Sequence, residues 1–158
     1  MSVRHFFRCV LCICAVFLLT GGVIFGQSNE ILDTVLEQDS LVTEYGAYLV
    51  FTASEMLPET VSVDEAADFL GIVEEEWKLK DYSSESPITL GQYAYLITRA
   101  FEIKEGLFYR LFPGSRYAVR DLAFLGIVRE HPNAGRTLSG EEAVRILGNT
   151  LEWLDTRS

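Results

Sequence analysis

FLGIV at residues 69–73 returns, letter for letter, as FLGIV at residues 124–128. Each copy closes an amphipathic run and is followed by a polar gap. A second apolar run then begins, at Ile88-Thr89 after the first copy and at Leu138-Ser139 after the second. Two amphipathic runs that recur in the same order are typical of a helix-pair repeat, in which neither unit buries its apolar stripe alone. We therefore predict stacked helix pairs.

Three capping boxes mark where these helices begin. Ser62 is followed three residues later by Glu65, Thr89 by Gln92, and Ser139 by Glu142. In such a box the two side chains satisfy each other's free backbone N–H groups at a helix N-terminus. Gly71 lies near the expected end of the first helix, where close packing or a turn would explain it. The two FLGIV copies are 55 residues apart, whereas the apolar runs that follow them begin 50 residues apart. The polar gap after the first copy is therefore expected to be longer than the gap after the second.

An earlier, more diverged unit precedes these two. Asn29 can cap a helix over residues 30–38, and residues 42–56 form a second apolar run. This run is rich in β-branched and aromatic residues, so a strand remains an alternative. Ala47-Tyr48-Leu49 matches Ala94-Tyr95-Leu96 and favours a helix. The sequence thus predicts an all-α domain over residues 29–158 with about six helices. Its repeat units cover residues 29–56, 62–103 and 115–153.

The first 28 residues have the pattern of a secretory signal peptide. Arg4 and Arg8 precede an apolar core, and small residues follow it. The alternative is an uncleaved anchor, since residues 9–26 give an apolar stretch near the lower limit for spanning a bilayer. All three cysteines belong to this leader, so the exported chain must be held by its core rather than by disulfides. We expect export to the periplasm or cell envelope.

Charge is unevenly distributed along the rest of the chain. Residues 29–86 carry 15 acidic and 2 basic side chains, a net charge of −13. Residues 87–158 carry 8 acidic and 9 basic ones, a net charge of +1. An acidic protein repels nucleic acid and anionic lipid, so neither is an expected partner, and membrane contact is expected only at the N-terminal segment. The acidic half is a solvated face, or else the two halves present different surfaces to different partners.

Catalytic and metal-binding patterns are missing from the sequence. His131 is the only histidine after the leader, and it stands before a proline in a predicted turn. Without cysteine or a Ser-His-acid set, nucleophilic catalysis has no candidate residues. No His/Cys spacing typical of zinc and no alternating acidic loop typical of calcium is present. We expect no cofactor, no metal and no enzymatic activity.

One segment mixes aromatic and basic residues in this acidic chain. It runs from Gly106 to Tyr117 and has no counterpart in the earlier units. Planar rings beside guanidinium groups suit sugar rings, acidic groups or an acidic motif on a partner protein. The alternative is a connector whose rings fill the core and whose arginines pair with the acidic half. The candidate binding residues are Phe108, Tyr109, Arg110, Phe112, Arg116 and Tyr117.

The order of these elements resembles the S-layer homology repeat. The matching stretches are residues 66–73 with 88–101, and residues 116–128 with 138–151. Where the family has Thr-Arg-Ala-Glu at the second cap, this chain has Thr89-Leu90-Gly91-Gln92 and Ser139-Gly140-Glu141-Glu142. The resemblance implies a helix-pair fold and a role in attaching exported proteins to cell-wall polymers.

Together these features predict an exported, non-catalytic binding or scaffold module of the cell envelope. Its expected partner is an envelope protein or a cell-wall glycan. The alternative function is that of a membrane-tethered structural subunit of an envelope assembly, held by an uncleaved N-terminal anchor.

Overall fold

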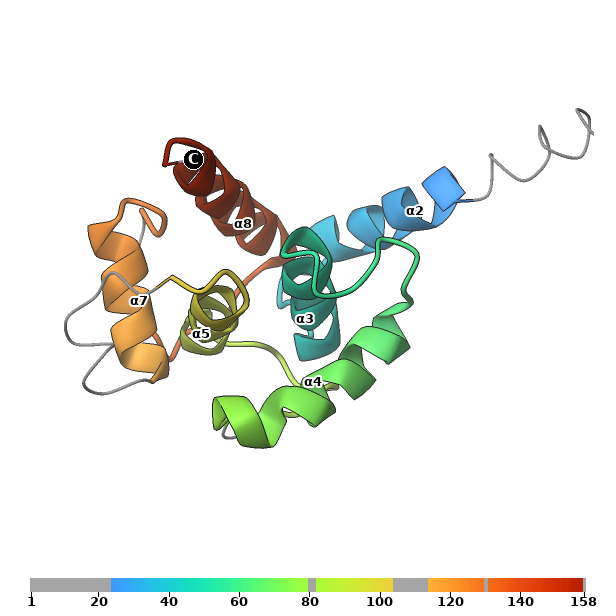
Figure 1. Cartoon of the computed structure of the whole chain (residues 1–158), viewed down its shortest axis with the longest axis horizontal. Coiled ribbons are helices and arrows are strands. Elements are labelled where there is room, and N and C mark those ends of the chain that lie inside the picture. Colours follow the sequence, from blue (N-terminus) through green and yellow to red (C-terminus); the bar gives the residue numbers. More distant parts are fainter. Residues whose placement is uncertain (1–23, 80–81, 104–113, 130, 158) are drawn as a thin grey trace, which may run out of the picture. The chain divides into compact units, whose positions relative to one another are not determined.

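The computed structural model describes residues 24–79, 82–103, 114–129 and 131–157 (Figure 1). These residues form α-helices and no β-strand, which confirms the all-α prediction. The chain divides into two units, Met1–Asp33 and Thr34–Ser158, and the second contains the central hydrogen-bond ring and the clefts described below. The six described helices are α2 (Ile24–Leu36), α3 (Thr43–Ala53), α4 (Val63–Trp77), α5 (Leu90–Ala100), α7 (Ser115–Phe124) and α8 (Gly140–Asp155).

A closed ring of three backbone hydrogen bonds lies at the centre of the second unit. The Leu41 N–H donates to the Leu138 carbonyl (2.7 Å), Leu138 to Ile88 (3.2 Å), and Ile88 back to Leu41 (2.8 Å). All three side chains are completely buried. Each residue stands just before one of the helices α3, α5 and α8, so the ring joins the three repeat units in a cycle.

The first helical residue of each of these three helices is capped by another unit. The N–H groups of Thr43, Leu90 and Gly140 donate to the carbonyls of Ser86, Arg136 and Gln38, each at 2.9 Å. The N-terminal N–H groups of a helix have no partner within the helix and need one elsewhere. Here the segment that precedes one central helix supplies it to another, so the caps close the same cycle as the ring.

The outer helices pack mainly on the central helix that precedes them. α4 packs on α3, where the Phe51 ring meets Phe69 and Trp77 edge-on at centroid distances of 5.0 and 5.9 Å. α7 packs on α5 in the corresponding way. α4 also contacts α5, because the Tyr95 hydroxyl donates to the Trp77 carbonyl (2.7 Å). A helix that opens one sequence repeat therefore buries its apolar stripe largely against the previous repeat.

The predicted helices are found, with one difference at a helix start. Residues 43–53 form helix α3, so the strand alternative for residues 42–56 is excluded. The expected cap at Asn29 is wrong, because α2 already begins at Ile24 and Asn29 lies inside it. Residues 1–23 of the predicted leader lie outside the described residues, and its cleavage stays a prediction. No helix in the described part of the chain combines the length and hydropathy needed to cross a bilayer.

The two FLGIV copies, although identical in sequence, differ in structure. The first lies wholly inside α4, which continues to Trp77. The second ends a helix: Phe124 is the last residue of α7, and Gly126 adopts a left-handed conformation with φ +76°. Ile72 is 74% exposed, whereas Ile127 is 1% exposed. The counterpart of Gly126 is Lys78, which ends α4 with φ +56°.

This structural register corrects two expectations. Lys78 and Gly126 are 48 residues apart, whereas the caps that follow them, Thr89 and Ser139, are 50 residues apart. The segment between the end of one helix and the next cap is therefore longer in the second unit, not in the first. Gly71 serves neither close packing nor a turn, because a Cβ atom added there would meet nothing within 4 Å. The shared glycine is required only in the second copy, where the backbone turns left-handed.

Candidate functional site

A cleft of about 900 Å³ lies between the first turns of α7 and the turn that leads to α8. The helix contributes two guanidinium groups and a phenol ring, and the turn contributes a short polar segment. The lining residues are Ser115, Arg116, Tyr117, Arg120, Pro132, Asn133, Ala134 and Gly135.

A glycine is required where α5 approaches two residues of this cleft, Ala134 and Ser115. Gly91, near the start of α5, donates its N–H to the Ala134 carbonyl at 2.9 Å. A Cβ atom at Gly91 would come within 2.8 Å of that oxygen and 3.1 Å of the Ser115 Cβ. The start of α5, the start of α7 and the turn at Ala134 therefore come together at the Cα atom of Gly91. This close approach explains why the second residue after Thr89 is a glycine.

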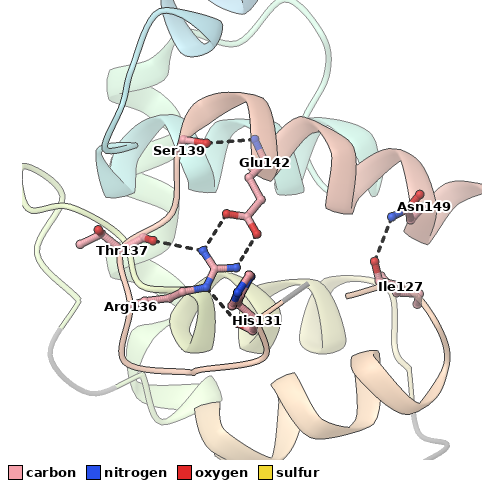
Figure 2. A network of polar contacts seen from close by, with 7 residues as sticks. All are labelled: Ile127, His131, Arg136, Thr137, Ser139, Glu142 and Asn149. Atoms are coloured by element: carbon pink, nitrogen blue, oxygen red, sulfur yellow. Dashed lines mark hydrogen bonds and ion pairs between the residues drawn. The ribbon is translucent and has the colours of Figure 1, made fainter. Parts of the chain in front are cut away.

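Arg136 holds the turn at residues 132–135 in place (Figure 2). Its guanidinium forms a two-pronged ion pair with the Glu142 carboxylate, one N–O distance being 2.7 Å. Its Nε donates to the His131 carbonyl (3.0 Å), and Nη1 reaches the Thr137 carbonyl (3.4 Å). A planar guanidinium with several partners has one favourable orientation, so it holds both ends of the turn in place.

The ion pair changes the third predicted capping box. Ser139 accepts a hydrogen bond from the Glu142 N–H (3.3 Å), as expected. The Glu142 carboxylate, however, pairs with Arg136 instead of returning to the cap (Figure 2). The boxes at Ser62 and Thr89 are complete. In the last unit, Ser139 therefore still caps the helix, while Glu142 stabilises the turn through Arg136.

A second, smaller hollow of about 220 Å³ lies beside the same ion pair. It is lined by His131, Arg136, Ser139, Glu141, Glu142 and Arg145. His131 is exposed, in agreement with its interpretation as a loop residue. Both acidic and basic groups line this hollow, its volume is smaller, and its guanidinium at Arg136 is already paired with Glu142. The larger cleft is therefore the better candidate for binding.

The chemistry of the larger cleft suits recognition of an anionic or polar group. Arg116 and Arg120 are exposed and lie four residues apart, so they share one face of α7. The half-buried Tyr117 supplies a ring beside them. Guanidinium groups bind carboxylates and similar anions with two hydrogen bonds, and rings stack on flat ligands. Within the described residues, no group of three or more His, Cys, Asp or Glu is placed to hold a metal ion.

The structure places two of the six predicted binding residues in this cleft. Arg116 and Tyr117 line it. Phe108, Tyr109, Arg110 and Phe112 lie outside the described residues.

The prediction from sequence missed Arg120 and Asn133. The helical spacing from Arg116 could have identified Arg120. Asn133 could not be paired with α7 from the sequence, because only the tertiary structure brings its turn there.

Comparisons with known proteins add no relative: no family model matches the chain, nor does any curated protein or solved structure.

Proposed function

We propose that this protein is an exported, non-catalytic binding module of the cell envelope. Its cleft at α7 holds an envelope protein or a cell-wall glycan. The observation that carries the proposal is the pair Arg116 and Arg120 beside Tyr117, facing a turn that Arg136 and Glu142 hold in place. Two cationic groups on a rigid frame favour a ligand with carboxylates or other anionic groups.

The cyclic arrangement of the three central helices supports a further part of the proposal. We propose that the fold is of the S-layer homology type, with helix pairs arranged around the ring of Leu41, Ile88 and Leu138. Such a frame is held by backbone bonds and apolar burial and needs no disulfide. It leaves the loops and outer helices available for contacts with a partner.

The test compares variants of the full-length chain in binding to purified cell-wall glycan and in capture of proteins from envelope extract. Arg116→Ala with Arg120→Ala should reduce binding by at least about tenfold, since a charge-assisted hydrogen bond contributes about 1.5–3 kcal/mol and about 1.4 kcal/mol corresponds to a factor of ten. Arg145→Ala is the control for loss of an exposed arginine outside the cleft, because Arg145 lines the smaller hollow. Far-ultraviolet circular dichroism checks that each variant is folded.

Each result separates the possible ligands. Saturable glycan binding that depends on Arg116 and Arg120 would support anchoring to the wall. Capture of a defined protein with the same dependence would support a scaffold role. Binding that is equal in the wild type, the double variant and the Arg145 control would contradict the assignment of the cleft.

A further inference from the structure

The outward face of α7 carries a basic stripe that ends in an aromatic ring. Arg116, Arg120 and Phe124 follow one another at intervals of four residues, and all three are exposed. Such a row lies on one side of a helix, with about 6 Å between successive members. Phe124 is 90% exposed, the highest value among the large apolar side chains of the described residues.

The outward face of α4 carries the opposite charge in the same spacing. Asp64, Asp68 and Ile72 also follow at intervals of four residues and are also exposed. Ile72 is 74% exposed, whereas no other large apolar side chain in the described part of the chain, apart from Phe124, exceeds 45%. The two most exposed apolar groups thus occupy the same third position in two oppositely charged rows.

The surroundings of the α4 row reinforce its charge. Around the α4 row lie further exposed acids, including Glu65 and Glu74 to Glu76. Burial raises the pKa of Glu44 in α3, and the charge of Asp64 raises it further, so the negative charge of Asp64 is felt on α3. On α7, Asp121 is the single acid in a helix with two arginines.

We propose that this face of α7 binds the α4 face of a second copy of the chain, with the two helices parallel. Asp64 then lies opposite Arg116, Asp68 opposite Arg120, and Ile72 packs against Phe124. The equal spacing satisfies all three pairs in a single register, whereas an antiparallel arrangement places Ile72 against a guanidinium.

The contact uses different faces of the two copies and is therefore heterologous. Each copy keeps one unused face, so further copies add head to tail and form a ring or an open filament. This self-assembly goes beyond the proposed function, because it requires no other ligand.

Charge reversal in the full-length chain tests the proposal. Sedimentation velocity in a non-ionic detergent at about 50 mM salt, where charges are weakly screened, measures association over a range of concentrations. The wild type should form dimers and larger species. Arg116→Glu with Arg120→Glu, or Asp64→Arg with Asp68→Arg, should raise the dissociation constant at least about tenfold, because like charges then face each other. An equimolar mixture of the two variants should associate again.

Controls keep the test independent of folding and of total charge. Glu141→Arg with Glu152→Arg changes the net charge as the α4 variant does, but on α8, and should associate like the wild type. Ile72→Ser and Phe124→Ser remove only exposed groups and should each weaken association without lowering the melting temperature. High salt should dissociate the wild type.

Three results would overturn the proposal: a monomeric wild type at all concentrations, association unchanged by both charge reversals, or a mixture that stays dissociated. Association through the apolar N-terminal segment would give the second of these. Arg116 and Arg120 also line the cleft at α7, so a second copy and a ligand compete for them. Asp64 and Asp68 do not line that cleft, so their reversal removes self-assembly without changing any cleft residue.

Discussion

Glu44 and Glu65 show how two residues of one type, both in the first turn of a helix, differ in their energetics. Burial raises the pKa of Glu44 above its ordinary value of 4.5, and the charges of Asp64 and Glu85 raise it further. Hydrogen bonds from the Ser62 backbone and hydroxyl lower the pKa of Glu65. From sequence alone, each acid favours its helix N-terminus through the helix dipole. The neighbours decide which acid stabilises the fold as an anion.

Replacing Glu44 by Gln should raise the melting temperature at pH 7. The pKa of Glu44 is higher in the folded than in the unfolded state, so its ionisation weakens folding. Stability is therefore regained as the pH falls through the folded-state pKa, and the advantage of the variant should shrink towards pH 4. Thermal melts of the wild type and Glu44→Gln across this range measure the effect.

Glu65→Ala provides the contrast with opposite sign. Its lowered pKa means that the anion stabilises the folded state above the ordinary pKa and that this contribution is lost as the pH falls. The substitution should lower the melting temperature at pH 7 and have less effect in acid. Equal pH dependence of both variants would contradict the assigned neighbours.

At the scale of one element, α8 contains two glycines with different requirements. Gly140 begins the helix, and a Cβ atom there would lie 1.7 Å from the Val35 carbonyl oxygen and 2.6 Å from its carbon. Gly148 lies in the helix interior, where a Cβ atom would meet nothing within 4 Å. Both clashing atoms at Gly140 belong to the backbone, so no side-chain rotation relieves them.

Alanine at these two positions should therefore have opposite effects. Gly140→Ala should destabilise the domain by at least about 1–3 kcal/mol, the usual cost of overpacking. Gly148→Ala should stabilise it by roughly 0.5–1 kcal/mol, because alanine loses less backbone entropy in a helix. Urea unfolding monitored by circular dichroism measures both. A destabilised Gly148→Ala, or a neutral Gly140→Ala, would contradict the described packing of α8.

At the scale of the whole molecule, the ring of Leu41, Ile88 and Leu138 makes the three units depend on one another. No segment can leave the ring without breaking two of its three hydrogen bonds. All three amides are buried in the core. The units should therefore unfold together, rather than one repeat at a time as in an open solenoid.

Native-state hydrogen exchange tests this dependence. The amides of Leu41, Ile88 and Leu138 should exchange with the same free energy, equal to that of global unfolding. The Thr156 amide, which bonds to Glu152 at the end of α8, should exchange through local fraying and serves as the internal control. A lower opening free energy for one ring amide would show that its unit opens independently.

The candidate site was predictable in part for a physical reason. Arg116 and Tyr117 could be identified because they depart from an acidic composition, and Arg120 follows from helical spacing. The turn at residues 132–135 could not be joined to them. Its place depends on hydrogen bonds to α5, a helix some 40 residues earlier in the sequence, and on the pairing of Arg136 with Glu142.

The sequence by itself determined the helices of this protein and most of their starts. Apolar spacing and capping side chains act within a few residues, so residues 62–65 and 89–92 are sufficient to set the starts of their helices. Tertiary structure decided which residues of the two repeats occupy equivalent structural positions. FLGIV is helix interior in α4 and helix end in α7, because α4 continues to bury Trp77, whereas α7 ends at Phe124 and the chain turns at Gly126 to bury Ile127. Burial depends on neighbours that are distant in sequence, and an identical stretch of five residues cannot specify them.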